Sequence, residues 1–309
     1  MVTQLRFDER VVIVTGAGRG LGRAYARLLA SRGASVVVND LGTEMDGTGA
    51  DGDPALAVVE EILRDGGSAV VDIGDVSTTA GAEAVVATAL REYGRLDILV
   101  NNAGIIRWAE LADADREELD RHLAVHVAGT FNMSRAAWPH LTTRGYGRIV
   151  NTISTGMLGL SNLISYGAAK GGVLGLSHGL ADAGRSHGIL VNMISPLADT
   201  RMARGQPGSE PTAAMEALAP DLVAAVVAYL AHEDCQVTGE IYLAGGGRVA
   251  RTFIGQTAAF VKPDLSPEDV RANWNAINEI AAFDVPSGTM GASIAFHARL
   301  DPPTTAAES

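Results

Sequence analysis

A tyrosine and a lysine stand four residues apart in the stretch "YGAAK", Tyr166 to Lys170. The chain has only two lysines, Lys170 and Lys262, and its other 22 basic residues are arginines. On a helix this spacing places both side chains on one face. A free tyrosine has a pKa of about 10, and a fixed cation beside it favours the phenolate and lowers that pKa. The pair is therefore a candidate for general acid–base chemistry; the alternative is two polar residues on a solvated helix face.

A serine, Ser154, lies just beyond the predicted strand Arg148–Thr152 and ahead of Tyr166 in the chain. In a parallel sheet, ligands bind at the carboxyl ends of the strands, and Ser154 would lie there. Its hydroxyl could hold a substrate oxygen on which charge develops. Lysine suits a place beside a phenol and ribose hydroxyls because it is a compact point charge, whereas the planar fork of arginine suits carboxylates and phosphates.

A glycine-rich turn, "TGAGRGLG", follows the first predicted strand and opens the first predicted helix. Gly16, Gly20 and Gly22 would tighten the turn, admit a pyrophosphate close to the backbone and let the helix pack on the strand. The start of the helix then offers free N–H groups to the phosphates. This order of strand, glycines and helix predicts a dinucleotide site; the alternative is a flexible turn.

Two charged residues bear on which dinucleotide would bind. Asp40 closes the second predicted strand, where an acid can accept hydrogen bonds from the ribose of the adenosine, and its charge would repel a 2′-phosphate. Arg19, inside the glycine turn, could instead meet that phosphate or remain in solvent. We weigh Asp40 more heavily, and the sequence therefore predicts NAD as the coenzyme.

Short β-branched runs alternate with longer amphipathic stretches along the chain. This alternation, with strands apolar on both faces, predicts an α/β doubly wound Rossmann fold with a seven-stranded parallel sheet and a C-terminal helical extension. The expected strands are Val11–Thr15, Ser35–Asn39, Ala69–Asp72, Ile98–Asn101, Arg148–Thr152, Leu190–Ile194 and Glu240–Leu243. The expected helices are Leu21–Arg32, Pro54–Arg64, Thr78–Tyr93, Glu117–Leu141 and Ser165–His187.

Several segments fall outside that alternation. Residues 41–53, rich in Gly and Asp, are expected to form a loop, with a metal site as the alternative. Residues 200–219 form an insert rich in Pro, Met and Ala. We expect a Rossmann domain over 1–247, an extension over 248–300 packed on it, and a disordered tail over 301–309. A helix in the extension should begin after Ser266, which can cap it ahead of Pro267 and two acids.

The composition excludes several classes of protein. The net charge of −12 argues against a surface for nucleic acid or anionic membrane. No apolar run approaches the ~20 residues of a membrane span, and the first residues lack the pattern of a signal peptide. A single cysteine, Cys235, fits a reducing compartment and is expected to be a buried residue. With no peroxisomal address at the end of the sequence, we expect a cytoplasmic protein.

Taken together and in this order, "TGAGRGLG", "NNAG" (101–104), Ser154 and "YGAAK" resemble the short-chain dehydrogenase/reductase family. The resemblance implies that Tyr166 is the acid–base, that Ser154 orients the substrate, and that Lys170 binds the nicotinamide ribose and tunes Tyr166. It implies that Asp75 lies near the adenine, although Asp75 could merely cap the next helix. The coenzyme contacts it implies are Gly16, Arg19, Gly20, Leu21, Gly22, Asp40, Asp75, Val76, Asn102, Ala103, Gly104, Tyr166, Lys170 and Pro196.

The chain departs from the family pattern at two positions. Where many members have a catalytic Asn, this chain has His126, in "HVAGTF". In the family the backbone carbonyl at that position holds a water in a proton relay, and a carbonyl survives the change to His. We expect a structural His126, with a titrating one as the alternative. Many members also have Gly after the proline that follows the sixth strand, whereas here Leu197 follows Pro196, so this loop should differ in backbone shape.

A narrower resemblance covers the chain from its start to about Phe296. The stretches "VVVNDLG", "SRAAWPHL" and "SPEDVRANW" are similar to the (3R)-hydroxyacyl-CoA dehydrogenase units of the peroxisomal multifunctional enzymes type 2. That likeness implies NAD, a (3R)-3-hydroxyacyl-CoA substrate, and a homodimer or homotetramer built through the two longest helices. Arginines could meet the phosphates of CoA, or could simply be solvated: Arg107, Arg201, Arg204, Arg248 and Arg251. The alternatives are a dehydrogenase of another hydrophobic alcohol, such as a steroid or terpenoid, and a non-catalytic dinucleotide sensor.

Overall fold

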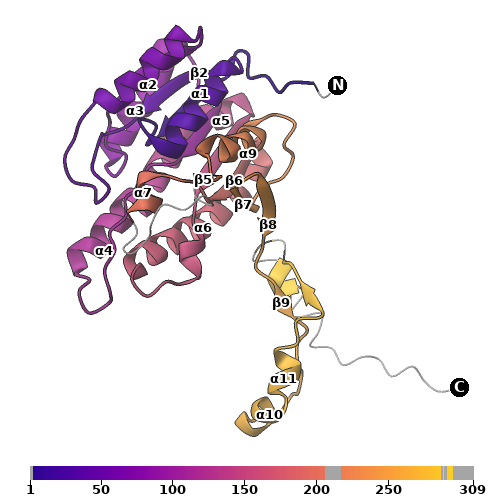
Figure 1. The fold of residues 1–309 in the computed structure, drawn as a ribbon. Coiled ribbons are helices and arrows are strands. Elements are labelled where there is room, and N and C mark those ends of the chain that lie inside the picture. The colour runs from indigo at the N-terminus through magenta and orange to yellow at the C-terminus, as the bar shows by residue number, and fades with distance from the viewer. Residues whose placement is uncertain (1–2, 206–216, 287, 289–290, 295–309) are drawn as a thin grey trace, which may run out of the picture. The chain divides into compact units, whose positions relative to one another are not determined.

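A twisted, mostly parallel β-sheet forms the centre of the protein (Figure 1). The structure, a computed structural model, describes residues 3–205, 217–286, 288 and 291–294. The seven predicted parallel strands are confirmed, and an eighth, β8 (Arg248–Thr252), joins the sheet at the edge beside β7. The parallel strands are β1 (Val11–Thr15), β2 (Ser35–Asn39), β3 (Ser68–Asp72), β4 (Ile98–Asn101), β5 (Gly147–Thr152), β6 (Ile189–Pro196) and β7 (Ile241–Gly245).

The strand order is β3-β2-β1-β4-β5-β6-β7-β8, so the direction of winding reverses between β1 and β4. In open α/β sheets a ligand binds at such a reversal, outside the carboxyl ends of the strands. The glycine turn after β1 and the "NNAG" stretch at the end of β4 flank this point. The topology alone therefore brings together two of the motifs that the sequence singles out.

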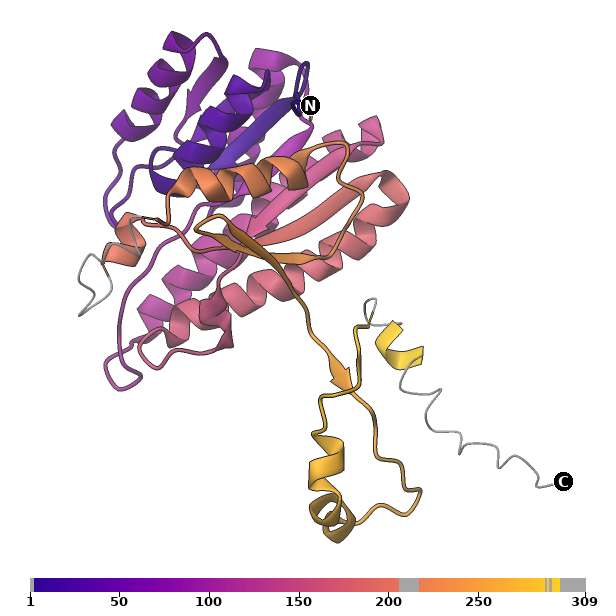
Figure 2. The ribbon, with the colours of Figure 1, turned by 45° about the vertical axis from the view of Figure 1, so that its right-hand side comes forward.

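Helices cover both faces of the sheet and make a three-layer unit, which Figure 2 shows from a second direction. Alternate residues of one strand point to opposite layers: Val12 and Val14 pack with one set of helices, and Val11 and Ile13 with the other. The first set is α1 (Gly20–Ser31), α2 (Asp53–Arg64) and α9 (Pro220–Ala231). The second set is α3 (Thr79–Tyr93), α5 (Gly129–Arg144) and α6 (Ile164–Gly184), which runs on into a short 3₁₀ turn, Arg185–His187.

The long helix expected over Glu117–Leu141 is wrong as a single element. The structure divides it into α4 (Arg116–His122), a π-helical turn (Leu123–Ala128) and α5. The wider i→i+5 bonding of a π turn inserts an extra residue, and such turns are frequent at functional sites. Here the π turn contains His126, the residue that replaces the family's Asn.

The sheet continues past the predicted domain boundary at Gly247. A two-residue turn, Gly246-Gly247, with both glycines at positive φ, joins β7 to β8 as in a tight antiparallel hairpin. The chain divides into two compact units, Met1–Arg251 and Thr252–Ser309. The predicted tail, 301–309, lies outside the described residues.

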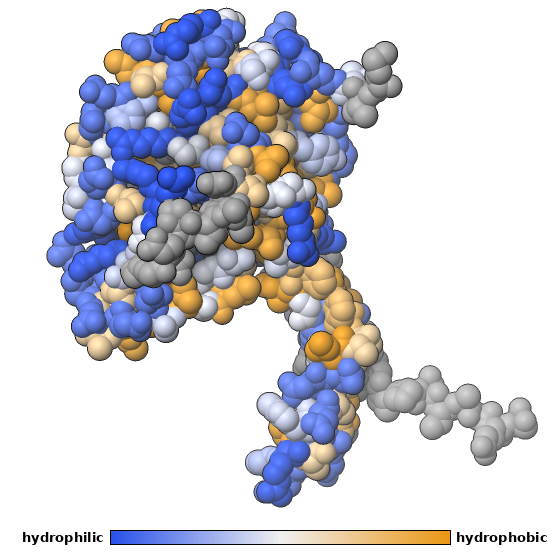
Figure 3. All heavy atoms as spheres, viewed as in Figure 1, coloured by the Kyte–Doolittle hydropathy of each residue, from blue (hydrophilic) through white to orange (hydrophobic). Residues whose placement is uncertain are grey.

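In the residues that the structure describes, the C-terminal unit contains only short elements. A two-stranded ribbon pairs β9 (Gln256–Thr257) with β10 (Phe283–Asp284), and between them lie α10 (Pro267–Ala272) and α11 (Trp274–Ile277). Ser266 caps α10 and forms a reciprocal capping box with Asp269, as its sequence predicts. Apolar side chains lie at the surface of this unit (Figure 3), including Phe253, Ile254 and Trp274.

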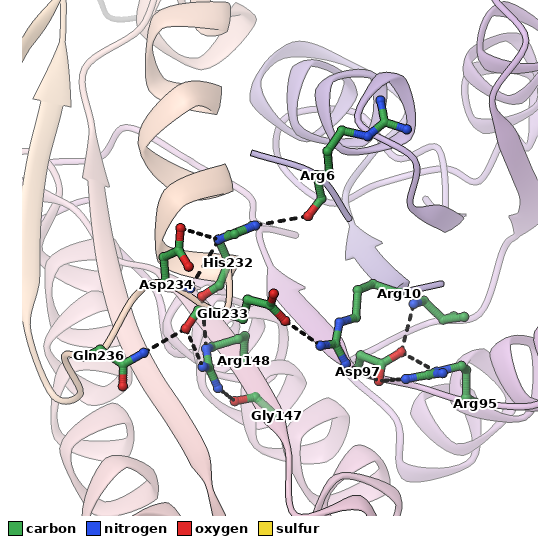
Figure 4. Close-up of polar contacts among 11 residues, drawn as sticks. Arg6, Arg10, Arg95, Asp97, Gly147, Arg148, His232, Glu233, Asp234 and Gln236 are labelled. Atoms are coloured by element: carbon green, nitrogen blue, oxygen red, sulfur yellow. Dashed lines mark hydrogen bonds and ion pairs between the residues drawn. The ribbon is translucent and has the colours of Figure 1, made fainter. Parts of the chain in front are cut away.

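A network of arginines and acids lies at the amino ends of the strands, opposite the carboxyl ends where ligands bind (Figure 4). Asp97, fully buried just before β4, accepts two hydrogen bonds from Arg95 at 2.8 and 2.7 Å. Arg148 at the start of β5 donates to the carbonyl of His232, 3.2 Å away, beyond α9. The ring of Tyr146 lies between the guanidinium groups of Arg10 and Arg148, at 4.1 and 4.5 Å from its centroid. These contacts join the first strand to the segment after α9 and satisfy a buried charge.

Candidate active site

A cavity of about 780 Å³ opens at the carboxyl ends of the strands, at the reversal between β1 and β4. All sixteen residues that the sequence predicts for catalysis or coenzyme binding line it. They are Gly16, Arg19, Gly20, Leu21, Gly22, Asp40, Asp75, Val76, Asn102, Ala103, Gly104, His126, Ser154, Tyr166, Lys170 and Pro196.

The glycine turn has the shape that a dinucleotide pyrophosphate needs. Gly16 and Gly20 have positive φ angles of 62° and 53°, which side chains rarely allow. A Cβ on Gly16 would lie 2.8 Å from the Cα of Ala103, and one on Gly22 would lie 2.1 Å from the carbonyl oxygen of Gly16. Gly22 thus lets α1 pack directly on the turn. The backbone geometry fits a nicotinamide dinucleotide at the start of α1.

Asn102 and Thr15 brace this turn from the neighbouring strand. The Asn102 amide donates to the carbonyls of Thr15 and Gly16, at 2.9 and 3.0 Å. The Thr15 hydroxyl accepts from the backbone N–H groups of Asn102 and Ala103, both at 3.0 Å. The "NNAG" stretch therefore holds the glycine turn in place, a role the sequence did not assign to it.

Asp40 and Asp75 lie at the end of the cavity formed by β2 and β3. The Asp40 carboxylate accepts from the N–H of Gly18 at 2.8 Å and from the N–H of Gly42 at 2.7 Å, which fixes its direction. Asp75 accepts from the N–H of Ser77 at 2.9 Å. Thr78, not Asp75, caps α3, so the alternative of Asp75 as the helix cap is wrong.

Ser154, Tyr166 and Lys170 meet at the other end of the cavity. Ser154 follows β5 and begins a 3₁₀ turn, Thr155–Leu158, by accepting from the N–H of Gly156 at 3.0 Å. Tyr166 and Lys170 lie one turn apart on α6, with the Lys170 ammonium 5.6 Å from the centroid of the Tyr166 ring. A Cβ on Gly156 would lie 3.1 Å from that ring, so this glycine gives the phenol its place.

In the chain without coenzyme, burial opposes the lowering of the Tyr166 pKa that Lys170 is expected to cause. Burial raises the pKa of Tyr166, and a hydrogen bond with Ser154 lowers it in part. Burial also lowers the pKa of Lys170 to about 7, because only 3% of the residue is exposed. The Lys170 ammonium donates to the Thr152 carbonyl at 2.7 Å. Burial is the largest cause of both pKa shifts, because removing water disfavours the charged form of each group.

His126 lies against the phenol and against the "NNAG" backbone. Its ring meets the Tyr166 ring edge to face, with centroids 5.4 Å apart, and its Nε2 lies 2.9 Å from the carbonyl of Ile105. A Cβ on Gly104 would lie 2.6 Å from the His126 ring, so the glycine makes room for the larger side chain. Burial and the Lys170 cation hold the pKa of His126 well below its usual value. The ring is therefore neutral near pH 7, which favours the expected structural role of His126 over the titrating alternative.

The rest of the cavity is largely apolar, and the sequence did not identify most of its lining. It includes side chains from four separate segments: Met45, Trp108, Leu160, Leu163, Leu197, Met202 and Leu218. The loop over residues 41–53 forms one wall, and Gly205 lies against the Met45 side chain. The acids of this loop bind its own backbone: Asp46 accepts from Thr48, and Asp51 from Asp53. Among the residues described, no cluster of His, Cys, Asp and Glu could hold a metal ion.

Two of the arginines that line the cavity are paired with acids of the chain itself. Arg201 lines the cavity 3.3 Å from Glu44, and Arg121, which the sequence did not single out, lies 2.7 Å from Glu117. Arg204 forms a two-pronged pair with Asp199. The part of the insert at 206–216 lies outside the described residues. Within the part of the chain that the structure covers, no helix has the length and apolar character needed to cross a bilayer.

Comparison with known proteins agrees with this geometry. Residues 10–208 match the family described as short chain dehydrogenase. The chain is 44% identical over 281 residues to a putative short-chain type dehydrogenase/reductase of Mycobacterium tuberculosis, covering 90% of this chain and 97% of that protein. It is 41% identical to the peroxisomal multifunctional enzyme type 2 of Mus musculus, covering 93% of this chain but only 39% of the mouse protein.

A likeness in three dimensions supports the same grouping. The full-length peroxisomal multifunctional enzyme type 2 of Drosophila melanogaster superposes with a TM-score of 0.79 at 32% identity, over 96% of this chain and 50% of that one. A short chain dehydrogenase from Mycobacterium avium superposes with a TM-score of 0.75 at 37% identity, over 88% of this chain and 95% of that one.

Proposed function

Because the chain belongs to the short-chain dehydrogenase/reductase family of oxidoreductases, which act on CH–OH groups, we propose that Tyr166 is its acid–base and Ser154 its substrate-orienting residue. Lys170 would bind the nicotinamide ribose and set the charge beside Tyr166. The observation that carries this proposal is the meeting of all three residues in the same cavity as the glycine turn. A nicotinamide dinucleotide bound there would supply the hydride acceptor at its ring.

The residues of the chain would divide the chemistry of alcohol oxidation as follows. The Ser154 hydroxyl holds the oxygen of the substrate alcohol. The Tyr166 phenolate takes the proton from that oxygen as a hydride leaves the carbon that bears it for the nicotinamide ring. In the reverse reaction Tyr166 returns the proton. Lys170 favours the phenolate while it is charged, and with a pKa of about 7 its charge is sensitive to what binds beside it.

NAD is the proposed coenzyme. Asp40 is held by two backbone N–H groups at the end of β2, so its carboxylate cannot readily turn away from an incoming 2′-phosphate. Arg19 is exposed on the glycine turn and is the group that could favour NADP instead. A fixed acid at this position disfavours the phosphate more than a mobile arginine favours it.

A (3R)-3-hydroxyacyl-CoA is the proposed substrate, with the 3-ketoacyl-CoA as product. Similarity to the peroxisomal multifunctional enzyme of the mouse and to the peroxisomal hydratase-dehydrogenase-epimerase of Saccharomyces cerevisiae, at 38% identity over 90% of this chain, supports it. Two observations favour the second candidate, another hydrophobic secondary alcohol such as a steroid or terpenoid. The substrate end of the cavity is apolar, and Arg201 and Arg204 are already paired with acids.

A panel of alcohols separates these candidates. We expect (3R)-hydroxyacyl-CoAs to be oxidised with NAD, and only slowly with NADP. We expect no oxidation of the (3S) epimers, hydroxysteroids or terpene alcohols. The measurement is the initial rate with each coenzyme across several acyl chain lengths. Turnover confined to steroid or terpene alcohols would contradict the CoA assignment and keep the catalytic one. Equal rates with NADP would contradict the role of Asp40.

A homodimer or homotetramer is the proposed assembly, through α4, α5 and α6. Small residues on α6 leave open space: a Cβ on Gly171, Gly175 or Gly179 would meet nothing within 4 Å. Phe131, on α5, is 48% exposed. Close packing of helices from two copies would cover such a surface. Light scattering should give a mass of two or four chains; a mass of one chain, 32.0 kDa, would contradict the proposal.

A cytoplasmic location is also proposed, although the named multifunctional relatives are peroxisomal.

A further inference from the structure

Two stacked imidazole rings, those of His122 and His126, pack against the phenol ring of Tyr166. The rings of His122 and His126 lie nearly parallel, at 11°, with centroids 6.0 Å apart. Each meets the Tyr166 ring edge to face: His122 at 6.2 Å and 84°, and His126 at 5.4 Å and 89°. His122 comes from the end of α4 and His126 from the π turn, so two elements converge on one side chain of α6.

The contacts of His122 fix its tautomer. Its Nδ1 lies 2.9 Å from the carbonyl oxygen of Glu118 one turn earlier, so Nδ1 carries the hydrogen and Nε2 carries a lone pair. His122 is 1% exposed, and its Nε2 has no hydrogen-bond partner among the described residues. A buried polar atom without a hydrogen-bond partner destabilises the fold, and a leucine or phenylalanine would fill the same space at lower cost. Packing alone therefore does not explain a histidine beside the phenol.

We propose that His122 is a positioning residue for Tyr166: its neutral ring, stacked on His126, holds the phenol in place, and its protonation disables the site at acid pH. This inference rests on the proposed function of Tyr166. His122 does not itself touch substrate or coenzyme, since it does not line the cavity, whereas His126 does.

The surroundings of His122 decide its charge. Burial lowers the pKa of His122, and the nearby cations Arg121 and Arg107 lower it further, while Glu118 raises it. From α6, the cation of Lys170 acts on the partner ring, His126. Because the pKa is depressed, the neutral ring is the stable form at pH 7, and the charged form appears only as the pH falls below the ordinary histidine value of about 6.5.

A charged His122 would act on Tyr166 in two ways. It would lie in a buried stack beside His126 and within the field of Arg107 and Arg121, so that the stack would open to admit water. Its Nε2 would also change from acceptor to donor. Either change would loosen the two edge-to-face contacts that hold the phenol.

The reductive direction isolates this effect. There, Tyr166 must be protonated and Lys170 is best charged, and acid favours both states. A loss of reductive turnover below about pH 6.5 therefore cannot come from Tyr166 or Lys170. The assay uses NADH and the ketone formed from the preferred alcohol of the panel, and it follows kcat and KM from pH 5 to 8.

We expect the wild type to lose kcat on the acid side and the coenzyme KM to change little. His122→Phe keeps a ring against Tyr166 and removes the titration, so its kcat should stay within about 3-fold of wild type at pH 7.5 and the acid loss should shrink or vanish. His122→Ala removes the ring, and its kcat should fall about 10-fold at every pH, within the range of a misplaced catalytic group. His178→Phe is the matched control, because burial lowers the pKa of His178 on the same helix as Tyr166, away from the cavity. It should keep the wild-type profile.

An unchanged acid loss in His122→Phe, or wild-type kcat in His122→Ala, would overturn the proposal. NMR titration of the imidazole of His122 in the coenzyme-free protein provides a readout that does not depend on turnover. A midpoint at or above 6.5 would overturn the proposal even if the proposed reaction is right. If no alcohol of the panel is oxidised, the proposed function fails, and the NMR titration still reports the state of His122.

Discussion

Replacing Tyr166 with phenylalanine is expected to lower turnover by about 10³-fold or more while NAD binding stays within about twofold of wild type. The change removes one oxygen. The phenyl ring keeps its contacts with His122 and His126 and its place beside Gly156. The measurement is kcat for NADH formation together with the Kd of NAD by calorimetry.

Tyr25→Phe is the matched control for this change. Tyr25 lies on the buried face of α1, fully within the core, and its hydroxyl has no partner among the described residues. Removing it should leave turnover unchanged and the stability equal or slightly higher. If Tyr166→Phe turned over like wild type, the acid–base role would be wrong. If neither the wild type nor any variant oxidised an alcohol but all bound NAD equally, the chain would be a dinucleotide sensor.

Replacing Lys170 with methionine is expected to lower kcat/KM by about 100-fold or more and, at the same time, to stabilise the coenzyme-free protein below pH 7. The folded chain depresses the pKa of Lys170 from 10.5 to about 7. Between about pH 7 and pH 10.5 the unfolded chain holds a proton on Lys170 that the folded chain does not. The free energy of unfolding of the wild type should therefore rise as the pH increases over this interval. Methionine carries no charge to bury, so Lys170→Met should have a higher Tm than the wild type below pH 7. This difference in Tm should shrink over the same interval.

Two further variants complete this test. Lys170→Arg keeps a positive charge but places a larger, planar group in a site that is 3% exposed, and it should lose most of the activity too. Lys262→Met removes the chain's other lysine, which lies 2.6 Å from Asp269, and should keep wild-type turnover. Full activity in Lys170→Arg would show that charge alone suffices, and an unchanged Tm profile in Lys170→Met would contradict the depressed pKa.

Much of the fold could be predicted because local signals and tertiary structure agree. β1, β2 and β4 are apolar on both faces, and their bounds match the prediction residue for residue. The π turn could not be predicted, because "LAVHVAG" has the apolar spacing of an ordinary helix and the extra residue is accommodated only by packing against α6 and Gly104. β8 was missed because Gly246-Gly247 reads equally well as the end of a domain.

The coenzyme end of the site was easier to predict than the substrate end. Positions such as Gly16 and Gly22 are dictated by backbone contact, which leaves a signature in the sequence. The apolar wall comes from Met45, Trp108, Leu160 and Leu218, which are far apart in the chain and individually unremarkable. The direction of the Tyr166 pKa was also beyond sequence reasoning, since it depends on how much water the folded site excludes.

The arginine and acid network at the amino ends of the strands makes this protein a convenient scaffold for redesign. Arg10, Asp97 and Arg148 secure the sheet from the end that carries no chemistry. The segment after β6, which includes Leu197 and Met202, lines the cavity at the opposite end of the sheet. That segment could be replaced to sample new specificities, while the sheet, Ser154, Tyr166 and the glycine turn are left unchanged.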